Sequence, residues 1–246
     1  MASRRLASGK NTVMLPADIN LAVPTSEKQF VGDIPFGSYF DMDLNNYVGV
    51  YWRGEWGTDD YDLSYINEKG MKYGWNTRYK DDSGEVVYSG DMTQAEPEAT
   101  EMFYCSRQLP DGFFKLNRYD GEPGSRARIF FGHEEIADFH LSYMVDPKTI
   151  VFKADIFPEQ NDCVIGGVFD NRIYIFSVES GNARVSSDST ALMCLSRRIR
   201  LQLQMRDLLT ASGYEVLDPD SDAVPDYDFR NYTKSQLIEF YSSIEK

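Results

Sequence analysis

The chain has 246 residues, of which 42% are hydrophobic and 14% aromatic, so it is long and apolar enough to form a large core. Its 39 acidic residues against 25 basic ones give a formal net charge of -14, which argues against a protein that binds nucleic acid through the phosphate backbone. No apolar run is long enough to span a membrane, and the basic start lacks an apolar core behind it, so we expect neither a membrane span nor a signal peptide.

Residues 1–29 contain few regularly spaced apolar side chains. The segment starts with a basic, serine-rich stretch and continues through two proline-containing pieces, 15–18 and 23–26. A segment without apolar periodicity seldom enters a hydrophobic core. We therefore expect residues 1–29 to form an extended N-terminal arm, of the kind that orders on a neighbouring molecule.

From Tyr39 to Val178 the chain alternates short apolar runs with turn residues, a pattern typical of a β-sandwich. The strongest turn signals are Asp81-Asp82-Ser83-Gly84 and Asp170-Asn171. Residues 30–186 are therefore predicted to form a mainly β domain, a β-sandwich of two antiparallel sheets. The expected strands are 47–52, 61–67, 71–75, 85–88, 101–105, 113–118, 127–131, 149–157, 163–169 and 172–178.

One of the expected strands is acidic. Because successive side chains of a strand point to opposite faces, Asp60, Asp62 and Ser64 project from one face, while Tyr61 and Leu63 project from the other. The first face thus presents a row of oxygen atoms.

A second acidic segment, residues 89–101, carries Asp91, Glu98 and Glu101. Calcium takes about six to eight oxygen ligands, so a strand end and a loop of this composition form a candidate calcium site. The spacing fits no EF-hand loop. The alternative interpretation is that these acids are solvated side chains at a strand edge and in turns.

Three short motifs follow one another in a characteristic order: Ile34-Pro35-Phe36-Gly37-Ser38, the Asp-x-Asp-Leu-Ser strand at 60–64, and the Ser-Gly-Asp-x-Thr loop at 89–93. Over about residues 30 to 180 the chain resembles the TerD-type family, which is linked to tellurite resistance and stress response. Met92 departs from that pattern, because many members have Asn there.

The resemblance implies a β-sandwich that binds calcium through the acidic strand and the Gly-Asp loop. It also implies a role in bacterial stress response or defence. The calcium ligands that it implies are carried by Asp60, Asp62 and Ser64 on the strand and by Asp91, Thr93 and Glu101 on the loop.

After Glu179 the spacing of the apolar residues becomes helical. It predicts one long amphipathic helix over residues 190–212, with Leu195, Ile199 and Leu203 against the sheet. The other face of this helix is basic and can bind either the acids of a partner or the chain's own acids. The candidate partner-binding residues on that face are Arg197, Arg198 and Arg200.

A final short helix is expected after Thr233. Thr233 and Gln236 have the spacing of a capping box, and the apolar residues that follow repeat with helical period. Residues 187–246 are therefore predicted to form a helical C-terminal segment packed on the sandwich.

The common catalytic motifs are missing from the sequence: there is no Gly-x-Ser-x-Gly elbow, no P-loop and no His-Glu-x-x-His. We therefore expect a protein that is not an enzyme. The three cysteines form no Cys-x-x-Cys pair, which fits reduced thiols in the cytoplasm.

Two functions fit the sequence. The first is a calcium-binding interaction module, whose partners are other protein chains. The second is a structural or assembly component, for example of a phage particle, in which the protein would form a homo-oligomer in the virion and pack through its N-terminal arm and its basic helix.

Overall fold

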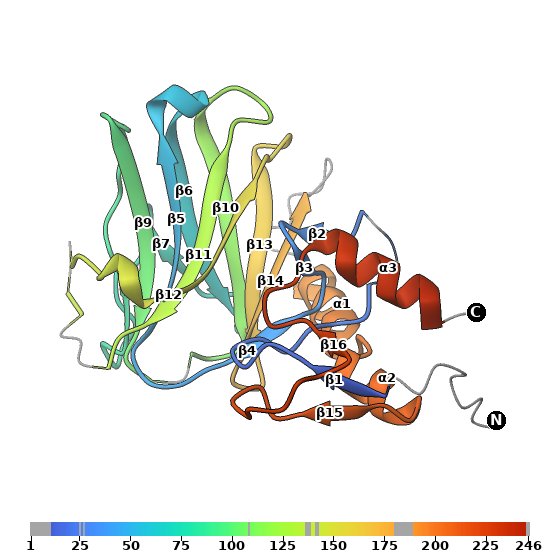
Figure 1. Ribbon diagram of the computed structural model, residues 1–246. Coiled ribbons are helices and arrows are strands. Elements are labelled where there is room, and N and C mark those ends of the chain that lie inside the picture. Colours follow the sequence, from blue (N-terminus) through green and yellow to red (C-terminus); the bar gives the residue numbers. More distant parts are fainter. Residues whose placement is uncertain are drawn as a thin grey trace.

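The computed structural model describes residues 11–24, 26, 28–107, 109–135, 139–140, 143–179 and 189–244. Two antiparallel sheets of six and five strands form the larger part of the molecule (Figure 1). A small parallel sheet and helices α1, α2 and α3 lie beside them, at the right of the figure. The prediction of a mainly β fold is confirmed.

Both large sheets are built from strands of the region between Tyr39 and Glu179. Strands are present at all ten ranges that the sequence pattern predicts, and β4 is an additional one. The six-stranded sheet has the order β4 (Tyr39–Asp41), β14 (Arg172–Glu179), β13 (Asp162–Phe169), β10 (Gly112–Gly121), β6 (Thr58–Asn67) and β7 (Lys72–Gly74). The five-stranded sheet has the order β12 (Ile150–Ile156), β11 (Ala127–His133), β5 (Asn46–Arg53), β9 (Glu98–Cys105) and β8 (Val86–Tyr88).

One hydrophobic core receives side chains from both sheets. Trp52 of β5 and Tyr61 of β6 are fully buried in it and meet edge to face, with ring centroids 5.9 Å apart. Leu63 is buried in the same core. The alternation along β6 therefore turns Asp60 and Asp62 to the opposite face of that strand.

The predicted turn at Asp170-Asn171 is confirmed. Both residues have positive φ, 50° and 59°, and they join β13 directly to β14. Two successive left-handed residues form the hairpin turn whose twist matches that of the flanking strands, and Asn and Asp tolerate this conformation better than most residues.

The prediction of an extended N-terminal arm is wrong for residues 11–24. Strand β1 (Thr12–Met14) is the central strand of the parallel sheet, between β15 (Glu215–Leu217) and β16 (Tyr227–Asp228). Val13 and Met14 are fully buried. A three-residue strand is too short to show a period, so the sequence pattern could not reveal it. Residues 1–10 lie outside the described residues.

Other residues of the N-terminal segment also pack on the molecule, since Leu21 and Ala22 are buried. Directly after this segment, Phe30–Val31 (β2) pairs with Ile34–Pro35 (β3) in a two-stranded hairpin. An assembly function that relies on a free arm therefore finds no support in residues 11–24.

The prediction of one long helix over residues 190–212 is wrong. Helix α1 (Ser189–Arg200) ends before α2 (Met205–Ala211) begins. The break has a tertiary cause: the Val23 N–H donates to the Leu203 carbonyl at 2.8 Å, and the Gln202 amide donates to the Val23 carbonyl at 2.8 Å. Ile199 is fully buried, as predicted, but the side chain of Leu203 is 49% exposed.

The predicted final helix, α3 (Lys234–Ile244), is confirmed together with its capping box. The Thr233 N–H donates to Gln236 Oε1 at 2.7 Å, and the Gln236 N–H donates to Thr233 Oγ1 at 3.3 Å. Leu237 and Phe240 bury one face of the helix. None of the described helices is both long and apolar enough to cross a membrane.

Candidate metal centre

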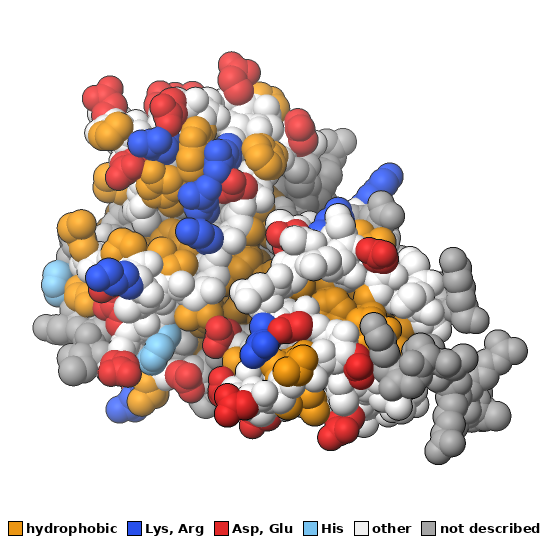
Figure 2. Space-filling model, in the orientation of Figure 1, with side chains coloured by type: hydrophobic (Ala, Val, Ile, Leu, Met, Phe, Trp, Pro, Cys, Tyr) orange, Lys and Arg blue, Asp and Glu red, His pale blue; other side chains and the backbone are white. Residues whose placement is uncertain are grey.

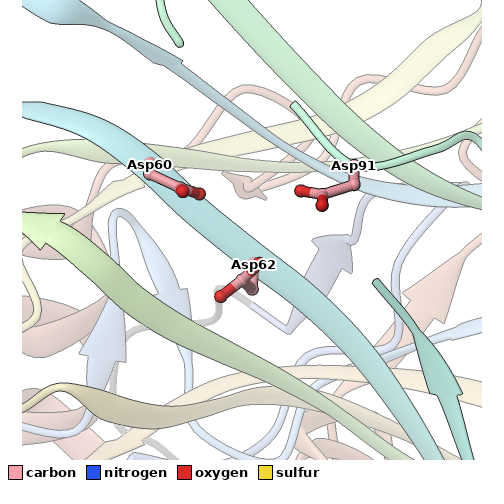
Figure 3. A group of neighbouring side chains, drawn as sticks. All are labelled: Asp60, Asp62 and Asp91. Atoms are coloured by element: carbon pink, nitrogen blue, oxygen red, sulfur yellow. The ribbon is translucent and has the colours of Figure 1, made fainter. Parts of the chain in front are cut away.

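The acidic face of β6 is buried, although it points away from the core. The Asp60 side chain is 6% exposed and that of Asp62 is 2% exposed. Both would be solvated if β6 were an open sheet face. Asp91, from the loop between β8 and β9 (residues 89–97), lies beside them (Figure 3).

Glu101 of β9 holds this loop in place. Its carboxylate is fully buried and accepts two backbone hydrogen bonds, from the Leu63 N–H of β6 at 2.6 Å and from the Met92 N–H of the loop at 3.0 Å. One side chain therefore joins the strand to the loop. Its place at the centre of these contacts makes Glu101 an anchor of the candidate centre.

The anchored loop brings Asp91 to the two buried aspartates. The ligand oxygens of Asp60, Asp62 and Asp91 lie within 4.8 Å of one another, which is close enough for one ion to contact all three. Figure 3 shows Asp60 and Asp62 on the strand and Asp91 facing them from the loop. Asp91 is exposed, so the group is reached from solvent on that side.

The negative charges of the group oppose one another. Burial, together with the nearby charges of Asp62, Asp91 and Asp120, raises the pKa of Asp60 from 3.8 to about 6. Burial also raises the pKa of Asp62, although a hydrogen bond from the Asn117 amide at 3.0 Å opposes this. A bound cation would relieve this repulsion.

One oxygen of the group is unsatisfied within the protein. Asp60 Oδ1 is buried and has no hydrogen-bond partner among the described residues. A buried carboxylate oxygen without a donor is costly, since each unsatisfied buried polar group destabilises a fold by about 1 to 3 kcal/mol. Asp60 thus has an unsatisfied buried oxygen and belongs to a group of three close carboxylates, and a bound cation would satisfy it.

The other residues of the predicted calcium site lie differently. Among the described residues, the group of close acidic ligands contains Asp60, Asp62 and Asp91 but not Glu101, whose two oxygens are engaged by backbone N–H groups. Ser64 is buried farther along β6, opposite Gly74 of β7. Thr93 is exposed on the loop. The three close carboxylates come from the strand and the loop that the sequence motifs single out, but the motifs could not separate the anchor from the other acids.

The predicted partner-binding arginines lie on a different part of the molecule, on α1. Arg197, Arg198 and Arg200 are exposed. The Arg200 guanidinium lies 3.3 Å from the Asp170 carboxylate, and that of Arg198 lies over the Phe36 ring, 5.6 Å from its centroid. Arg200 therefore contacts an acid of its own chain, as the intramolecular alternative predicts.

No protein-family model, no curated protein and no solved structure matches this chain. The resemblance to the TerD-type family rests on the three sequence motifs and stays a prediction.

The charge of Asp60 predicts a pH dependence of stability in the presence of a chelator. Between pH 3.8 and about 6 the folded state holds a proton that the unfolded state has released, so stability falls as pH rises through this window. Asn at this position has no such proton. The quantity to compare is the free energy of unfolding of the unchanged protein minus that of Asp60→Asn. We expect this difference to fall by about 1 to 3 kcal/mol from pH 4 to pH 7.

Denaturant unfolding of both proteins at a series of pH values measures this difference. The contributions of titrating groups far from Asp60 cancel in this difference, because both proteins share them. A difference that stays constant from pH 4 to pH 7 would show that the Asp60 carboxyl is solvated as in an unfolded chain.

Proposed function

We propose that this chain binds a divalent cation, calcium, at Asp60, Asp62 and Asp91, and that it acts as a non-enzymatic interaction module built on a two-sheet β-sandwich of the TerD-like type. The observation that carries the proposal is the unsatisfied buried oxygen Asp60 Oδ1, in a carboxylate that has a ligand oxygen within 4.8 Å of ligand oxygens of Asp62 and Asp91. The role in bacterial stress response or defence comes from the resemblance alone.

The donor set supports a hard cation. All three close ligands are carboxylates, and none of the three is His or Cys, which zinc sites commonly use. Calcium accepts mono- or bidentate carboxylates in an irregular shell of about six to eight oxygens, whereas magnesium demands near-ideal octahedral geometry. Two ligands from a strand and one from a loop suit the more tolerant ion, with water completing the shell on the exposed side of Asp91.

The ion would join two parts of the fold. Asp60 and Asp62 belong to β6 of the six-stranded sheet, and Asp91 belongs to the loop that leads into β9 of the five-stranded sheet. Binding would therefore stabilise the position of residues 89–97 against the strand. This links cation occupancy to the surface that the loop presents to a partner.

Calcium should raise the melting temperature. A ligand that binds only the folded state adds about 2.7 kcal/mol when its free concentration is a hundred times Kd, which for a chain of this size corresponds to roughly 5 to 10 °C. Thermal unfolding in chelator and in millimolar calcium measures the shift. Asp60→Asn, Asp62→Asn and Asp91→Asn should each remove most of it.

Asp59→Asn is the matched control. Asp59 is the exposed neighbour of Asp60 on β6, and its replacement removes the same charge from the same strand. This variant should keep the full calcium shift. Equal melting temperatures with and without calcium in the unchanged protein, or equal loss of the shift in Asp59→Asn, would contradict the proposed site.

A further inference from the structure

A second concave site lies on the outer face of the five-stranded sheet. It is a groove of about 600 Å³, and Met102 of β9 and Phe130 of β11 are among its lining residues. Between them on β5 stands Gly49, the register partner of both. A Cβ at position 49 would lie 2.3 Å from Phe130 Cζ and 2.6 Å from Met102 Cγ, so only glycine lets these two side chains lie across β5.

The walls of the groove are apolar and adaptable. Met92 from the loop before β9 is 42% exposed, and Met144 from the segment before β12 is 88% exposed. Val145 and Ile150 continue the same wall. Methionine is unbranched and polarizable, so surfaces rich in it adjust to ligands of different shape. Figure 2 shows hydrophobic side chains gathered with Lys and Arg side chains over this face of the molecule.

One side of the groove, formed by β11 and β12, carries more positive than negative side chains. Lys153 of β12 is the register partner of Phe130, and no carboxylate of the described residues lies within ion-pair distance of its ammonium group. Beside it, Arg128 and Arg126 share the single carboxylate of Asp155, at 2.7 and 2.5 Å. Two cations on one anion, together with Lys153, give a local positive excess in an acidic protein.

The acid on the opposite wall is already engaged. Glu98 accepts a hydrogen bond from the Tyr51 hydroxyl at 2.6 Å, and the Arg53 guanidinium lies 3.6 Å from the same carboxylate. Arg53 lies closer to Glu55, at 2.6 Å, so Glu98 keeps negative charge on the wall opposite Lys153. The combination of an apolar floor with one positive side selects a ligand that has an apolar body and an anionic end.

We propose that this groove binds a small amphiphilic carboxylate, with its aliphatic or aromatic body on Met102 and Phe130 and its carboxylate at the Lys153 ammonium group. The volume lies within the range of about 300 to 1,000 Å³ that is typical of small-molecule sites, which are mostly apolar with a few polar groups that fix orientation. The hydrogen bond between an ammonium and a carboxylate is charge-assisted and about twice as strong as one between neutral groups.

Decanoate is the probe, titrated into protein with 13C-labelled methionine methyl groups and with chelator present, so that the outcome does not depend on the cation centre. The methyl signals of Met92, Met102 and Met144 should shift with a common affinity, while those of the buried Met14 and Met205 stay in place. Lys153→Met should weaken binding about two- to fivefold, because it removes an exposed charge but keeps an apolar side chain.

Lys148→Met is the control, since Lys148 is exposed but does not line the groove, and it should leave the affinity unchanged. Decanol, which has the same chain without the charge, should bind about tenfold more weakly than decanoate. The proposal is overturned if the three methionine signals do not shift, if decanol binds as well as decanoate, or if Lys153→Met retains full affinity. Occupation by a peptide with an apolar C-terminal residue but not by decanoate would assign the groove to a protein partner instead.

Discussion

A chain that begins at Pro24 should lose the packed C-terminal part of the molecule. In the structure, β15 and β16 both pair with β1 and with no other strand, so the three-stranded sheet cannot form without residues 12–14. The truncation also removes several core side chains, each worth about 1.5 to 3 kcal/mol. The buried apolar residues lost are Val13, Met14, Leu15, Ile19, Leu21 and Ala22.

The expected loss is comparable with the whole stability of a typical protein, about 5 to 15 kcal/mol. Circular dichroism and denaturant unfolding measure it. A chain that begins at Asn11 retains every described contact of this sheet and is the control for the truncation at Pro24. Unchanged stability of the shorter chain, the one that begins at Pro24, would support the extended arm that the sequence pattern predicted.

Glu101→Ala should destabilise the protein by about 1 to 3 kcal/mol, because it leaves the buried backbone N–H of Leu63 and the partly buried one of Met92 without an acceptor. It should also abolish the calcium response. The other hydrogen bonds of this loop, between Ser89 and Met102, tie it to β9 and not to β6. Denaturant unfolding and the calcium-dependent melting shift measure the two effects separately.

Glu98→Ala is the control for this variant. Glu98 lies on the same strand, but its side chain is 51% exposed, and exposed ion pairs contribute about 0 to 1 kcal/mol. It should keep both the stability and the calcium shift. If Glu101→Ala unfolds at the same denaturant concentration as the unchanged protein, the carboxylate does not hold the loop.

The central strands were predictable because their apolar side chains recur over six or more residues and are separated by strong turn signals. Asp170-Asn171 and the capping box at Thr233 are local features, encoded in neighbouring residues, and the structure contains both. Strand β1 and the break between α1 and α2 depend on contacts between residues about 180 to 215 positions apart. The spacing of apolar residues along a short segment cannot reveal contacts between residues so far apart in the sequence.

The candidate centre was predictable in part for the same reason. Alternation along one strand fixes Asp60 and Asp62 on one face whatever the tertiary structure. Whether Asp91 or Glu101 meets them depends on how the loop folds over β6, and this is set by hydrogen bonds to Leu63 and Met92. An acidic side chain that serves as anchor and one that serves as ligand look alike in a sequence.

The most direct test of the account is the calcium content of the purified protein after equilibrium dialysis against calcium, measured by elemental analysis. The account predicts a single tightly bound calcium ion per chain in the unchanged protein and none in the folded triple variant Asp60→Asn, Asp62→Asn, Asp91→Asn. An unchanged protein without calcium, or a folded triple variant with the same calcium content as the unchanged protein, would contradict it.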